Sequence, residues 1–95
     1  MKIHELKTDP DSFDESWRGK KSWEIRLNDR DFRIGDSLVL RETNYTGEEM
    51  KAGKPLVYTG NRMLVEVSFI MAGPIYGLQD GWVIMSTNEL ERVSA

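Results

Sequence analysis

The sequence predicts an α+β fold in which five to six short strands curl into a small β-barrel, with one main helix near the N-terminus. Two observations lead to this expectation. Several segments of strand length have apolar side chains and are separated by glycine-rich or charged turns, and only one segment has a strong helix signal. A chain of 95 residues is long enough for one core. Residues 1–95 are therefore expected to form a single domain.

The main helix is expected to begin near residue 9 and to end before residue 19. Asp9 can cap it, and Pro10 suits the first helical position because the missing N–H would have no partner there. Phe13 and Trp17 are four residues apart and share one helical face, so they are expected to pack on the sheet. Gly19 is typical of the residue that ends a helix.

Residues 22–27 alternate strictly between apolar and polar side chains, which predicts a half-buried strand. Trp23, Ile25 and Leu27 form the apolar face, so Trp23 is predicted to lie in the core. Glu24 and Arg26 lie on the opposite, polar face.

The other expected elements are less sharply marked. An edge strand is predicted at residues 2–7, and further strands at 37–42, 62–72 and 82–86. Glycine and proline interrupt residues 44–60, which predicts a long loop with a short strand at 56–58. Residues 88–95 form a polar tail compatible with a short helix.

Composition excludes several classes of site. The chain has no cysteine and one histidine, so it lacks disulfides, thiolate metal sites and the HExxH and CxxC spacings. We therefore expect no metal and no cofactor. Neither a signal peptide nor an apolar stretch long enough for a bilayer is evident, which favours a cytoplasmic protein without membrane contact.

The charge distribution points to a small ligand-binding patch. The net charge of −3 argues against a broad, nonspecific DNA-binding surface. Residues 18–33, however, contain six basic and three acidic side chains. This local excess of positive charge suits one phosphate-bearing ligand, although a solvated, self-neutralising loop has the same composition.

A resemblance to a known family begins at the same place. Residues 19–26 read G-x-K-x-x-E-x-R, and residues 32–36 read F-x-x-G-D. These patterns resemble the ASCH domain, a branch of the PUA-like β-barrel superfold. The segments 4–7 (HELK), 28–32 (NDRDF) and 76–78 (YGL) with Gly81 are most similar to a short phage and bacterial ASCH-like family of uncharacterised function. The resemblance covers nearly the whole chain.

The resemblance implies a barrel with a cleft beside the first helix, into which Lys21, Glu24 and Arg26 point. PUA-like relatives commonly bind RNA, and some read modified bases. One bacterial ASCH protein is an amidohydrolase that removes acetyl from acetylcytidine. Its catalytic lysine would fall on Lys21, but Glu24 replaces its catalytic threonine, and its further glutamate has no evident counterpart here.

We therefore expect an RNA- or nucleotide-binding module, most simply a monomer. Lys21 and Arg26 would hold phosphate or base edges, Glu24 would accept a hydrogen bond from a base amine, and Tyr76 would stack on a base. The predicted nucleic-acid-binding residues are Lys20, Lys21, Ser22, Glu24, Arg26 and Tyr76.

Three other interpretations stay open. Lys21 and Glu24 could be the acid–base pair of a hydrolase acting on a modified nucleoside, or of a ribonuclease. The chain could instead be a phage-encoded factor that binds a host protein. Glu24 and Arg26 could also be an ordinary surface ion pair that contributes little free energy.

Overall fold

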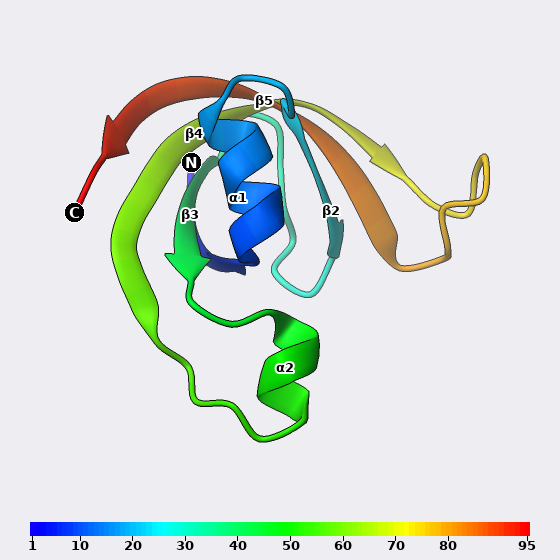
Figure 1. Ribbon diagram of the computed structural model, residues 1–95. Helices are drawn as coiled ribbons and strands as arrows, with labels where there is room; N and C mark the ends of the chain where they lie inside the picture. Colours follow the sequence, from blue (N-terminus) through cyan, green and yellow to red (C-terminus); the bar gives the residue numbers. More distant parts are fainter.

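Five strands form one sheet in the order β1-β3-β4-β5-β2 in the computed structural model, which describes residues 1–95. β1 is parallel to β3, and the other three neighbouring pairs are antiparallel. The strands are β1 (Ile3–Thr8), β2 (Trp23–Leu27), β3 (Ser37–Thr43), β4 (Tyr58–Ala72) and β5 (Trp82–Val93). The sheet curls into a half-barrel, and its long strands β4 and β5 arch around helix α1 (Pro10–Trp17) (Figure 1). The expected small, sheet-rich α+β fold is thus confirmed at this level.

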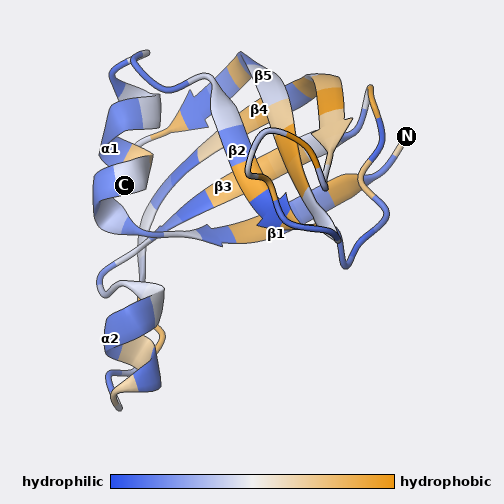
Figure 2. Ribbon diagram, turned by 90° about the vertical axis from the view of Figure 1, so that its right-hand side faces the viewer, coloured by the Kyte–Doolittle hydropathy of each residue, from blue (hydrophilic) through white to orange (hydrophobic).

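The core lies on the concave side of the curled sheet. Directly paired residues of antiparallel strands share a face, so Leu38 with Val65 and Leu40 with Met63 point the same way. Apolar bands on the strands alternate with polar ones (Figure 2). The buried core consists of Leu6, Phe13, Phe32, Leu38, Leu40, Met63, Val65, Val67, Val83 and Met85.

Helix α1 is anchored to the core by Phe13, with the ring of Trp17 5.6 Å from the Phe13 ring. The Asp9 side chain does not cap α1, contrary to the expectation. Its Oδ1 instead accepts a hydrogen bond of 2.9 Å from the backbone N–H of Gly47. Asp9 therefore connects the start of α1 to the start of a second helix, α2 (Gly47–Lys51).

Helix α2 lies within residues 44–60, where only a loop and a short strand were predicted. Thr46 accepts from the backbone of Glu49, and the Glu49 side chain accepts from the backbone of Thr46, which forms a complete capping box. The helix projects away from the sheet at the connection between β3 and β4 (Figure 1). β4 begins at Tyr58, four residues before the predicted start. Neither of the two short helices could span a membrane.

The expectation of a polar tail with a short helix at residues 88–95 is wrong, because β5 continues to Val93. This half of β5 pairs with the first half of β4, for example Leu64 with Glu91 and Arg62 with Val93. Backbone pairing with a long neighbouring strand decides the conformation, and the polar side chains of this segment are mostly exposed to solvent.

The predicted orientation of β2 is also wrong. Glu24 pairs with Met85, which is completely buried, so Glu24 faces the interior. Trp23, Ile25 and Leu27 consequently point to the outer face of the sheet, and between 43% and 49% of each remains exposed. Trp23 is therefore not a core residue.

The N-terminal end of the sheet is tied to the turn before β3 by Asp36. Its carboxylate accepts hydrogen bonds from the backbone N–H groups of Lys2 and Arg33 and contacts His4 Nε2 at 2.9 Å. Burial alone would raise the pKa of Asp36, but the contact with His4 and the two backbone hydrogen bonds lower this pKa to about 2. The His4 and Phe32 rings pack in a T-shaped arrangement with their centres 4.8 Å apart. Asp36 and His4 thus stabilise the fold.

Candidate functional site

Glu24 is the centre of a buried cluster of charges. Only 3% of the residue is exposed. Its Oε2 accepts a hydrogen bond of 2.5 Å from Lys21 Nζ, and its Oε1 accepts from Arg26 Nε at 3.2 Å and from Arg26 Nη2 at 2.9 Å. Taking a carboxylate out of water costs several kcal/mol unless it is paired and hydrogen-bonded. The two cations compensate this carboxylate and leave the cluster with one excess positive charge.

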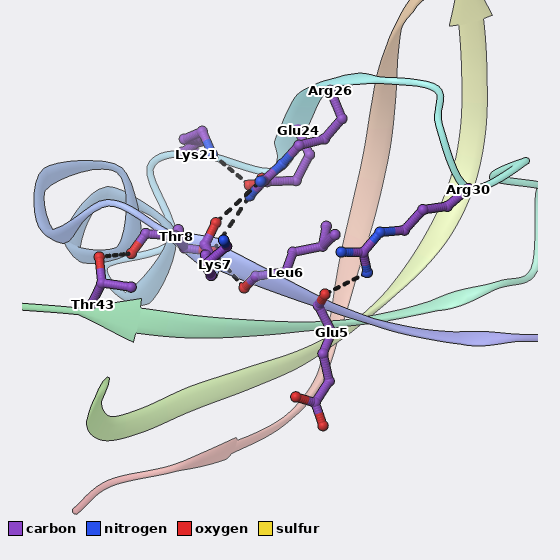
Figure 3. A network of polar contacts seen from close by, with 9 residues as sticks. All are labelled: Glu5, Leu6, Lys7, Thr8, Lys21, Glu24, Arg26, Arg30 and Thr43. Carbon is purple, nitrogen blue, oxygen red and sulfur yellow. Dashed lines mark hydrogen bonds and ion pairs between the residues drawn. The ribbon is translucent and has the colours of Figure 1, made fainter. Parts of the chain in front are cut away.

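Arg26 also crosses the gap between the two edge strands of the sheet, β1 and β2, which we call the seam. Arg26 Nη1 donates to the carbonyl oxygen of Lys7 at 3.1 Å, and Nη2 lies 3.5 Å from Thr8 Oγ1. Arg30, beyond the end of β2, donates from Nη1 to the carbonyl oxygen of Glu5 at 2.6 Å. Figure 3 shows both arginines reaching toward β1. Arginine side chains therefore connect β2 and the loop after it to β1.

A cavity of about 280 Å³ lies at the end of the seam beside α1. Its wall is mostly polar, with charged side chains and the Thr8 and Ser12 hydroxyls. The volume is close to the lower limit of small-molecule sites and suits a base or a phosphate group. The cavity is lined by Lys7, Thr8, Asp9, Ser12, Lys21, Trp23, Glu24, Ile25 and Arg26.

Three of the predicted site residues meet at this cavity: Lys21, Glu24 and Arg26. Lys21 and Arg26 keep part of their side chains accessible, 12% and 26% respectively. Both cations can therefore be reached from the cavity, and Glu24, which also lines it, is almost fully buried.

The other three predicted residues lie outside the cavity. Lys20 is exposed and is not part of the cavity wall, and Ser22 lines a smaller neighbouring cavity. Tyr76 is 91% exposed and lines a different, apolar cavity together with Ile25 and Ile84. The connection between β4 and β5 carries Tyr76 away from the cavity that Lys21, Glu24 and Arg26 line, and its stacking on a base stays a prediction.

Sequence reasoning missed Trp23 as a site residue. Trp23 lines the cavity, and Lys21 Nζ lies 4.9 Å from the centre of its ring. This distance is typical of a cation–π contact. The only signal in the sequence that Trp23 belongs to the site was its position within the motif, between Lys21 and Glu24. Thr8 and Ser12 gave no signal, because only the folded chain brings them to residues 21–26.

No group of three or more histidine, aspartate or glutamate side chains is arranged to hold a metal ion. The charged groups of the cavity can instead bind an anion through Lys21 and Arg26, or transfer a proton between Lys21 and Glu24.

The comparisons with known proteins give the family. No curated protein matches the chain significantly. Residues 3–87 match the family described as "Domain of unknown function (DUF3850)". This range includes the Lys21, Glu24 and Arg26 cluster and all the residues that line the cavity. Because the match covers most of the chain, the protein belongs to the DUF3850 family.

Proposed function

We propose that the protein is a nucleotide- or RNA-binding module of the ASCH, PUA-like type, with its ligand in the cavity beside α1. Two features support this assignment. The sheet is a curled half-barrel, and Lys21, Glu24 and Arg26 of the G-x-K-x-x-E-x-R pattern line one cavity that α1 also lines through Ser12. The resemblance to ASCH domains implies this combination.

The observation that carries the proposal is the buried Glu24 between two partly accessible cations. A carboxylate in this position holds Lys21 and Arg26 in place and compensates only one of their two positive charges. Lys21 has three N–H donors, of which one is directed to Glu24, so two are free for a phosphate group. An anion entering the cavity therefore meets a fixed positive group instead of a flexible surface lysine.

Trp23 supplies the second element that a nucleotide requires. Its indole is partly exposed beside the charged cluster and offers an apolar surface on which a base can stack. Glu24 Oε2 accepts one hydrogen bond from Lys21 and can accept one more from a base amine. Since the whole protein is acidic, we expect modest affinity that decreases with salt.

The test is an NMR titration of ¹⁵N-labelled protein with uridine monophosphate (UMP) and a short single-stranded RNA. Saturable shifts are expected at the backbone amides of Lys21 and Glu24 and at the Trp23 indole. Lys21→Ala should weaken binding about five- to tenfold, which corresponds to the loss of one charge-assisted contact. Lys51→Ala removes an exposed lysine on α2 and is the matched control. Equal affinities of Lys21→Ala and wild type would show that the assignment is wrong.

A second candidate function is hydrolysis of an acylated nucleoside such as acetylcytidine. The specific observation is that the Lys21–Glu24 ion pair borders the same cavity as two hydroxyl groups. Glu24 would take a proton from water as the water oxygen attacks the acetyl carbon. Lys21 would then protonate the amine as the C–N bond breaks, releasing acetate and cytidine. Chromatography of acetylcytidine incubated with excess protein tests this; no product, or equal product from Lys21→Ala, excludes it.

A further inference from the structure

A second cavity continues the seam on the other side of Arg26. It has a volume of about 370 Å³ and shares Ile25 and Arg26 with the first cavity. The two cavities therefore adjoin at Arg26, whose side chain crosses the seam between them, and we call the pair of cavities the groove. The second cavity is lined by Leu6, Ile25, Arg26, Leu27, Asp29, Arg30, Phe32 and Trp82.

The two arginines of this groove differ in how many donors they have left. In Arg26, Nε, Nη1 and Nη2 all have protein acceptors, on Glu24, Lys7 and Thr8. In Arg30, Nη1 alone has a partner, the carbonyl oxygen of Glu5. Arg30 is also exposed and forms no ion pair with a carboxylate. Its Nε and Nη2 groups are available for a bidentate contact with phosphate.

The attachment points of the two arginines lie close together along β1. Arg26 and Arg30 are fixed to the carbonyl groups of Lys7 and Glu5, two residues apart on β1. Two residues of a strand span about 6.6 Å. Arg30 is therefore held next to Arg26 along the same strand, close to the first cavity. Figure 3 shows Lys21, Arg26 and Arg30 following one another above β1.

We propose that Arg30 forms a second phosphate-binding position, so that the ligand is a single-stranded oligonucleotide of at least two nucleotides that lies along the seam. The inference rests on the proposed function of the first cavity. Lys21 and Trp23 bind one nucleotide there, and Arg30 binds the phosphate of the next one. The apolar wall of the second cavity, formed mainly by Leu27, Phe32 and Trp82, contacts its base.

Three tryptophans provide separate reporters for the test. Trp23 lines the first cavity and Trp82 the second, whereas Trp17 lines neither and packs against Phe13 and Arg92. The probes are UMP, with one phosphate, and the dinucleotide pUpU, with two. UMP is expected to shift the Trp23 indole signal only, and pUpU to shift both Trp23 and Trp82. The Trp17 signal should stay in place with either probe.

Affinities then test Arg30 itself. Wild type is expected to bind pUpU about tenfold more tightly than UMP, with a salt dependence steeper by about 0.7 in logarithmic slope. Arg30→Ala should reduce this ratio to about twofold. Arg30→Gln, which keeps an amide donor for the Glu5 carbonyl but has no charge, should do the same if charge is the cause. Arg33→Ala, which removes an exposed arginine paired with Asp31, should leave the ratio unchanged.

The outcomes separate the two proposals. Equal affinities for UMP and pUpU, with a Trp82 signal that does not move, overturn the second position while the first cavity keeps its assigned role. The second position is also overturned if Arg30→Gln keeps the wild-type ratio of the pUpU affinity to the UMP affinity. If neither probe moves Trp23, the first cavity is not a nucleotide site and both proposals fail.

Discussion

The buried charge cluster predicts a large loss of stability when Glu24 is replaced by alanine. This substitution leaves Lys21 and Arg26 close together without their shared carboxylate. Removing one partner of a buried ion pair costs about 3–5 kcal/mol. Lys21 and Arg26 retain 12% and 26% of their side-chain exposure, so partial rehydration lowers the expected cost to about 2–3 kcal/mol.

Urea unfolding followed by circular dichroism measures this loss. With a slope of about 1 kcal/mol/M, the midpoint should fall by about 2–3 M, and the melting temperature by about 10–20 °C. Arg33→Ala is the control, because it breaks an ion pair with Asp31 in which both side chains are mostly exposed; its cost should stay below about 0.5 kcal/mol.

A second variant tests the cause of the effect. Adding Lys21→Met to Glu24→Ala removes one of the two uncompensated charges and should restore part of the stability. A loss below about 0.5 kcal/mol for Glu24→Ala alone would refute the reasoning. It would mean that Glu24 and its partners behave as an ordinary surface ion pair.

Three further predictions concern the fold. The pKa of Asp36 is lowered to about 2, so the ionised carboxylate should stabilise the fold by about 1–2 kcal/mol. This contribution should be present above about pH 4 and disappear as the pH falls toward 2. Asp36→Asn should remove this part of the pH dependence of urea unfolding. Gly73→Ala should cost about 1–3 kcal/mol in thermal unfolding, because a Cβ atom there would lie 2.1 Å from the carbonyl oxygen of Gln79. Gly77→Ala meets no neighbouring atom and should cost only about 1 kcal/mol, from its positive φ. Thr46→Ala should increase amide exchange in α2 and cost about 1 kcal/mol at most, since only the capping box is lost.

Local patterns predicted the strands that have a sharp signal. The alternation at residues 22–27 and the apolar segments near 37–42, 62–72 and 82–86 all correspond to observed strands. The pairing of β1 with β3 was not visible, because parallel pairing joins segments about 34 residues apart and leaves no mark in either one. The length of β5 was underestimated for the same reason: its polar second half is a strand only because β4 lies beside it.

The candidate site was predicted in part. Lys21, Glu24 and Arg26 do meet at one cavity beside α1, as the resemblance to ASCH domains implied. Trp23, which was predicted to lie in the core, lines the cavity, whereas Tyr76 lies outside it. The position of Trp23 results from the orientation of β2. Apolar patterning predicts which face of a strand points inward only when the polar face carries no charge that partners could compensate in the interior. Here two cations compensate Glu24, so the polar face turns inward and Trp23 turns outward.

The bonds across the seam also affect how the protein behaves at high concentration. The carbonyl groups of Glu5 and Lys7 point to the side of β1 that has no neighbouring strand, where a strand of another molecule could pair with them. Arg30 and Arg26 already occupy both carbonyl groups and place positive charge along this edge. We therefore expect the arginines that cross the seam to protect the chain from edge-to-edge aggregation.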